Sequence, residues 1–184
     1  MLDSRAMKSQ VMLLAASVFL WFAAGRIPAQ TLARPEVPPK IAASVNEQVV
    51  LIAHASGSQI YVCQAGSDEK LSWTLQAPDA DLADANGKNI GHHGTGPSWK
   101  LTDGSEVTAK AAARENAADP ADVPWLLLNV TGHTGSGALA KVTTIQRIHT
   151  KGGQPPASGC DAAHRGAETK SPYTAEYYFY SPAH

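Results

Sequence analysis

The sequence predicts an all-β fold: a single antiparallel sandwich or barrel of about nine short strands with little helix. Two observations predict it. Short runs rich in β-branched and aromatic residues recur along the chain, and turn signals such as Asn86-Gly87 and Asp103-Gly104 separate them. The length of 184 residues allows one such domain comfortably.

The first strands are expected over residues 46–55 and 58–65, where β-branched and aromatic residues cluster on either side of a Ser-Gly-Ser segment that predicts a turn. Residues 71–77 follow, and their large apolar side chains alternate with polar ones. This period of two is typical of a strand with one buried side.

Three later segments also predict strands. Residues 124–130 are continuously apolar, as expected of a central strand, and residues 141–150 carry apolar side chains on both faces. Residues 174–180 place aromatic residues on both faces. The one helical candidate, residues 106–122, is dense in alanine but short of large apolar residues, which favours a short surface helix or a loop insertion.

The N-terminal segment, residues 1–29, is typical of a signal peptide. Arg5 and Lys8 precede an apolar run over residues 11–24, which is too short to span a bilayer comfortably. An uncleaved anchor is the alternative. Residues 30–44 predict a proline-rich lead-in, and residues 45–181 the domain itself. We therefore expect an exported protein, in the periplasm or the medium.

Export gives the only two cysteines a meaning, because oxidising compartments favour disulfides. We expect a Cys63–Cys160 bridge, with two buried free thiols as the alternative. The net charge of −1 offers no basic surface for nucleic acid. After signal cleavage we expect no membrane partner, and the oligomeric state stays open.

Cofactor sites find little support. Gly135-x-Gly137-x-x-Ala140 resembles a dinucleotide fingerprint, but strand-like residues follow it where a helix is required. No GxSxG elbow is present, and Asp103 with Glu106 beside a turn is more typical of solvated acids than of a glycosidase pair. No cofactor is expected, and the chain is more typical of a binding protein than of an enzyme.

The segment Gly91–Trp99, GHHGTGPSW, is the most conspicuous motif. Neighbouring residues of a strand point to opposite faces, so His92 and His93 are not expected to meet one metal ion. No metal site is predicted. The segment is expected to be a loop between hairpin strands that delivers at most one histidine and one tryptophan to a shared face.

Aromatic residues are numerous for a small core. Tyrosine and tryptophan combine a flat apolar face with a polar group, which suits stacking on sugars or other ring ligands. Core and cross-strand packing is the alternative use for most of them.

Together, GSQIYVCQA, the tryptophan of LSWTLQA, GHHGTGPSW, DGS, PWLLLNV, VTTIQRIHTKGGQPP and YTAEYYFY resemble the family named domain of unknown function 3455. The resemblance runs from about Val45 to Tyr180 and implies an exported protein without an established activity. The matching positions are His92, Gly96, Pro97, Trp99, Asp103, Gly104, Ser105, Arg147, Gly152 and Gly153.

The expected ligand site comprises His92, Trp99, Arg147, Asp103 and Tyr178. The function expected is a non-enzymatic module that binds a small molecule or glycan. The alternatives are an extracytoplasmic enzyme, hydrolytic or metal-assisted, that uses His92 or His93 with an acid, and a structural envelope protein.

Overall fold

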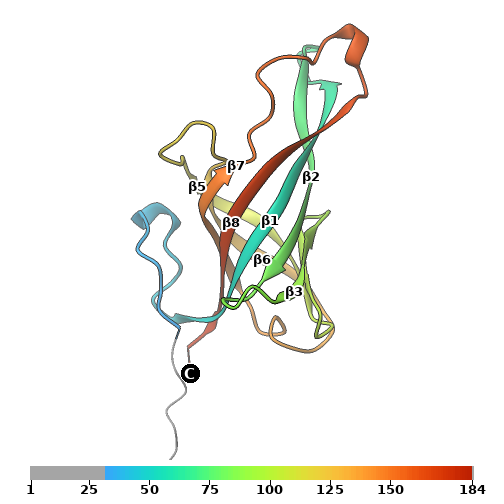
Figure 1. Cartoon of the computed structure of the whole chain (residues 1–184). Coiled ribbons are helices and arrows are strands. Elements are labelled where there is room, and N and C mark those ends of the chain that lie inside the picture. Colours follow the sequence, from blue (N-terminus) through green and yellow to red (C-terminus); the bar gives the residue numbers. More distant parts are fainter. Residues whose placement is uncertain (1–31, 184) are drawn as a thin grey trace, which may run out of the picture. The chain divides into compact units, whose positions relative to one another are not determined.

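The computed structural model describes residues 32–183, and the predicted signal peptide lies outside them. These residues form a closed antiparallel barrel in which each strand bonds to the next and β1 closes on β8 (Figure 1). The strands are β1 (Glu47–Ala65), β2 (Leu71–Ala83), β3 (Asn89–Gly94), β4 (Ser98–Leu101), β5 (Glu106–Glu115), β6 (Trp125–Thr134), β7 (Thr144–Gly152) and β8 (Glu168–Pro182). The 3₁₀ turns are η1 (Pro39–Ile41) and η2 (Ala162–His164). The all-β prediction is confirmed, and the architecture is the barrel.

The turn predicted at Ser-Gly-Ser is wrong, because β1 runs without interruption through Gly57. This glycine serves a close approach between strands. A Cβ at Gly57 would lie 2.2 Å from the carbonyl oxygen of Asp79 and 2.5 Å from Cα of Ala80, both on β2. The two expected strands are therefore one, which reduces the predicted number of strands.

The helix or loop expected over residues 106–122 is also wrong for its first part, which is strand β5. Two of its alanines are explained by what they face. Ala109 and Ala111 line a cavity, where larger side chains would occupy the space. The position of these alanines in a strand beside the cavity thus overrides the helix propensity of alanine.

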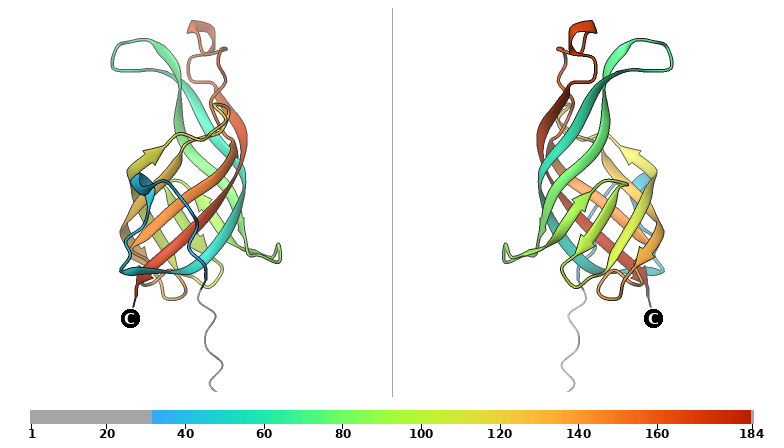
Figure 2. Two further views of the ribbon diagram at one scale, coloured as in Figure 1. Left: turned by 90° about the vertical axis from the view of Figure 1, so that its left-hand side faces the viewer. Right: turned by 90° about the vertical axis from the view of Figure 1, so that its right-hand side faces the viewer.

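Strands β1, β2 and β8 extend beyond the others, beside the long β7–β8 loop (Figures 1 and 2). The predicted disulfide is confirmed: Cys63 of β1 is bonded to Cys160 of that loop. In β2, pairing with β3 begins only at Ala80, so residues 71–79 have β1 as their only neighbour. Pro78 lies in this edge segment, where a missing N–H removes no ladder bond.

The interior core and an outer cluster use opposite faces of β8. Tyr177 and Phe179 point into the barrel, and Tyr180 packs outside. Residues 32–46, here called the strap, cover the outer cluster: Ile41 is fully buried, and its carbonyl accepts a 2.6 Å hydrogen bond from Gln146 Nε2. The predicted lead-in therefore packs against the barrel wall. No helix within residues 32–183 is long and apolar enough to cross a membrane.

Candidate functional site

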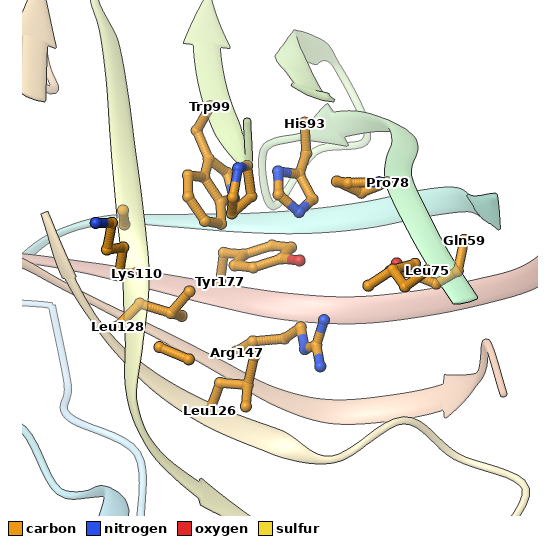
Figure 3. A pocket seen from close by; sticks show the side chains of 13 residues that line it. Gln59, Leu75, Pro78, His93, Trp99, Lys110, Leu126, Leu128, Arg147 and Tyr177 are labelled. Atoms are coloured by element: carbon orange, nitrogen blue, oxygen red, sulfur yellow. The ribbon is translucent and has the colours of Figure 1, made fainter. Parts of the chain in front are cut away.

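A cavity of about 300 Å³ opens beside residues 71–79 of β2, the segment that pairs with β1 alone. Side chains from all eight strands and the β3–β4 turn surround it, most of them apolar (Figure 3). The lining comprises Gln59, Leu75, Pro78, His93, Pro97, Trp99, Ala109, Lys110, Ala111, Leu126, Leu128, Arg147 and Tyr177. Leu75, predicted on a buried side of its strand, is half exposed at the rim because no strand covers that part of β2.

The short β3–β4 hairpin places His93 and Trp99 in the cavity wall. The two residues pair directly across the hairpin, and their rings stack with centroids 4.2 Å apart. Tyr177 of β8 meets both rings edge-on, with centroids 5.1 Å from His93 and 5.4 Å from Trp99. All three side chains are almost completely buried, so the cluster forms a fixed wall.

The histidine in this wall is neutral. Burial lowers the pKa of His93 to about 3, although its hydrogen bond to the Ser98 carbonyl opposes the shift. His93 Nδ1 lies 2.8 Å from that oxygen. A carbonyl only accepts hydrogen bonds, so Nδ1 carries the proton and Nε2 is left as an acceptor.

Arg147 brings a positive charge to the opposite side of the cavity. Figure 3 shows Tyr177 lying between Arg147 and the stacked pair of His93 and Trp99. Arg147 Nη2 donates a 2.8 Å hydrogen bond to the Pro124 carbonyl. Burial raises the pKa of the Tyr177 phenol, and the charge of Arg147 works against that rise. Tyr177 is therefore a neutral phenol at ordinary pH.

Three nitrogens of the lining are buried without a hydrogen-bond partner in the described structure: Gln59 Nε2, Trp99 Nε1 and Arg147 Nε. Buried polar groups are normally hydrogen-bonded, and each unsatisfied one costs about 1–3 kcal/mol. Three such donors around one cavity indicate a place for a molecule that accepts hydrogen bonds.

A wider groove of about 620 Å³ continues from the cavity, since the two share Leu75, Ala111, Leu126 and Arg147. Lys40 of the strap and Arg114 of β5 border this groove. None of the described residues that line either hollow is Asp or Glu. The approach to the cavity is therefore positively charged.

Two of the predicted site residues, Trp99 and Arg147, line this cavity together. His92 points to the other face of β3, where its ring nitrogens lie 3.4 Å from Asp79 and from Asp81. The separation of the two adjacent histidines onto opposite faces follows the alternation of a strand.

Asp103 and Tyr178 also lie outside the lining. The Asp103 carboxylate accepts hydrogen bonds from the Ser105 hydroxyl at 2.6 Å, the Ser105 N–H at 2.8 Å and the Ala138 N–H at 2.8 Å. It thereby joins the β4–β5 turn to the β6–β7 loop. Tyr178 packs against the outer cluster and donates to Glu176 Oε2 at 3.2 Å.

Sequence reasoning chose His92 from the adjacent pair and did not single out Gln59. A signal for His93 was available in the hairpin itself. Trp99 and Leu101 alternate as apolar residues, and pairing across a turn centred on Gly96 sets His93, not His92, opposite Trp99. Gln59 carries no such signal, because its burial depends on how β1 bends. Within residues 32–183, no group of three histidine, cysteine or acidic side chains could hold a metal ion.

Fold and site together define a closed eight-stranded antiparallel barrel with an internal, mostly apolar cavity, an architecture that can enclose one small ligand. The chain belongs to the family described as Protein of unknown function (DUF3455), which matches residues 43–181. No curated protein and no solved structure matches the chain.

Proposed function

We propose that this is an exported, non-enzymatic binding protein that holds a small amphipathic organic molecule in the cavity of its barrel. The observation that carries the proposal is the combination of an apolar cavity of about 300 Å³ with three unpartnered nitrogen donors in its wall. Ligand sites typically pair an apolar lining with a few fixed polar groups, in cavities of roughly this size.

The wall favours an enclosed organic ligand over a glycan. Sugars stack on exposed aromatic faces, but Trp99 is 1% exposed and Tyr177 fully buried. One face of the Trp99 ring is covered by His93. The groups that remain available to a ligand are aliphatic side chains, ring edges and N–H donors.

The cavity also favours binding over catalysis. A hydrolytic or metal-assisted enzyme was expected to combine a histidine with an acid, yet none of the described lining residues is acidic. His92, which does contact acids, sits on the exposed face with Asp79 and Asp81. Buried donors without partners are rare in native proteins, and three of the four found within residues 32–183 belong to residues that line this cavity, which favours a binding protein over a purely structural one.

Export rests on two supports. The N-terminal segment has the pattern of a signal peptide, and a disulfide closes between Cys63 and Cys160, as is common in oxidising compartments. Sequencing the N-terminus of the protein recovered outside the cytoplasm tests this part. A mature start near residue 26 or 30 supports it, and retention of residues 1–29 on cytoplasmic protein contradicts it.

The binding proposal is tested with N-phenylnaphthylamine, a neutral dye whose fluorescence rises in apolar sites. We expect saturable binding to the disulfide-bonded protein. Ala111 borders the cavity, so Ala111→Trp should fill the opening and weaken the dye at least about tenfold. Ala85→Trp, in the exposed β2–β3 turn, is the matched control and should bind like the original protein. Equal binding by all three proteins would overturn the proposal.

A further inference from the structure

We propose that the ligand of the cavity is an organic monocarboxylate, with its acid group at Arg147 and its apolar part among the leucines. The inference rests on the proposed function and adds the chemical class of the ligand. It follows from the donors in the wall, from the charge of Arg147 and from the charge around the entrance.

The unpartnered groups in the wall are hydrogen-bond donors. Trp99 Nε1 and Arg147 Nε are donors only, and the Gln59 Nε2 amide group is a donor as well. A ligand that satisfies them must therefore present acceptors. An ionised carboxylate is an acceptor only, with two oxygens that can each take more than one hydrogen bond.

The charge of Arg147 also favours an anionic ligand. Within residues 32–183, no acidic side chain lies within ion-pair distance of its guanidinium. Yet the side chain reaches into an apolar barrel, where a partly buried charge is stabilised by a counter-ion. A carboxylate beside it supplies that counter-ion.

The amount of positive charge in the cavity wall favours a ligand with a single negative charge. His93 is neutral above pH about 3, since its pKa lies there, and the phenol of Tyr177 is neutral too. Among the described lining residues the only other cation is Lys110, which is exposed to solvent, whereas Arg147 is partly buried. One partly buried positive charge matches one negative charge better than the double charge of a phosphate monoester.

The residues around the entrance of the cavity favour an anion as well. Lys40 and Arg114 border the groove that leads to Arg147, and the described lining holds no acid. The chain as a whole has a net charge of −1, so this concentration of cations is local. Such a surface attracts anions and speeds their association, and salt screens the effect.

The rest of the cavity fits an aliphatic or aromatic tail. Leu75, Leu126 and Leu128 line it together with Pro78 and Pro97, none of which has a side chain that hydrogen-bonds. A tail placed there buries apolar surface, which contributes about 25 cal/mol for each Å² removed from water. Medium-chain fatty acids have this combination of one acid group and one apolar tail.

The test compares decanoate with decanol, which has the same chain length and no charge, by isothermal titration calorimetry on the disulfide-bonded protein. We expect decanoate to bind at least about tenfold more tightly, since hydrogen bonds to charged groups are stronger than neutral ones. Arg147→Met keeps the length of the side chain and removes the charge. It should abolish the preference by weakening decanoate while leaving decanol unchanged.

Gln59→Leu gives a second measurement that does not depend on the folding of an arginine variant. It removes one donor at nearly constant volume and should weaken decanoate a few-fold, again without an effect on decanol. Arg114→Met is the control at the entrance. It should slow association of decanoate at low salt and leave the dissociation rate unchanged.

Different results would contradict the carboxylate ligand and the binding function. Equal affinities for decanoate and decanol, or an unchanged preference in Gln59→Leu and Arg147→Met, would overturn the carboxylate while the cavity still bound N-phenylnaphthylamine. Absence of binding by the dye and by both decyl compounds would overturn the binding function itself.

Discussion

His93 and Trp99 face each other across the β3–β4 hairpin, and their rings are stacked within 12° of parallel. The contact holds the imidazole inside the barrel, where burial keeps it unprotonated. It also shows which histidine of the adjacent pair belongs to the interior: His92, one residue earlier, is nearly half exposed among carboxylates.

The burial of His93 predicts an acid-sensitive fold. Its pKa is lowered to about 3 in the folded protein, against about 6.5 when unfolded, so the unfolded chain binds the proton more readily between these values. Stability should therefore fall as pH drops through this window, by roughly 1 kcal/mol per pH unit from this group. Urea denaturation at several pH values measures the slope.

His93→Phe should flatten that slope because the side chain no longer titrates, whereas His92→Phe is the matched control on the exposed face. A slope that His93→Phe leaves untouched would show that other groups cause the acid sensitivity.

Asp103 is predicted to stabilise the protein without a role in ligand binding. The Ala138 N–H, followed by the hydroxyl and N–H of Ser105, lowers the pKa of the Asp103 carboxyl. Asp103→Ala removes these hydrogen bonds and should lower the free energy of unfolding by about 1–2 kcal/mol, a value reduced by solvent exposure. Affinity for N-phenylnaphthylamine should stay unchanged. A large loss of affinity in a still-folded variant would assign Asp103 to the site.

Two glycine variants distinguish close packing from backbone conformation. Gly57→Ala forces a Cβ against the β2 backbone and should cost about 2–4 kcal/mol. Gly87→Ala meets no atom within 4 Å, but its φ of 77° disfavours alanine, so about 1 kcal/mol is expected. Denaturant melts rank the two. The reverse order would contradict the close approach of β1 and β2.

The disulfide is predicted to stabilise the extended end of the barrel. It joins residues 97 positions apart, for which removal typically costs about 2–5 kcal/mol. Replacing both cysteines with serine should lower the free energy of unfolding by this amount. The dye should still bind, because neither cysteine lines the cavity. Unchanged stability would show that the loop is held by its other contacts, such as Trp73 Nε1 to the Ser158 carbonyl.

Much of the fold could be predicted from local signals. The Asn86-Gly87 and Asp103-Gly104 turns lie where expected, with positive φ at both glycines. Residues 174–180 carry aromatic residues on both faces, and in the structure this strand is covered on both sides. The role of Gly57 could not be predicted from the sequence, because glycine is favoured both in turns and where two strands approach closely. Ala109 and Ala111 of β5 could not be interpreted correctly for a similar reason, since their small size leaves room for a cavity that only the closed barrel creates.

The candidate site was harder to foresee. Trp99 and Arg147 were chosen for their chemistry, and they lie in one cavity although 48 positions separate them in the sequence. Choosing between His92 and His93 needed the register of the β3–β4 hairpin. Gln59 needed the three-dimensional course of β1. The pattern of apolar and polar residues along one strand predicts which face of the sheet a residue lies on. It does not predict which strands surround the same cavity.

The pairing of β1 with β8 bears on the order in which the protein folds. Glu47 pairs with Pro182 and Val62 with Glu168, so the ring closes only between the two ends of the domain. During synthesis, which begins at the N-terminus, this edge of β1 has no partner until residues 168–182 have been made. Contacts so distant in sequence make folding slow and leave an unpaired edge exposed to aggregation. We expect a chain truncated before β8 to depend on chaperones, and refolding of the whole domain to take milliseconds to seconds.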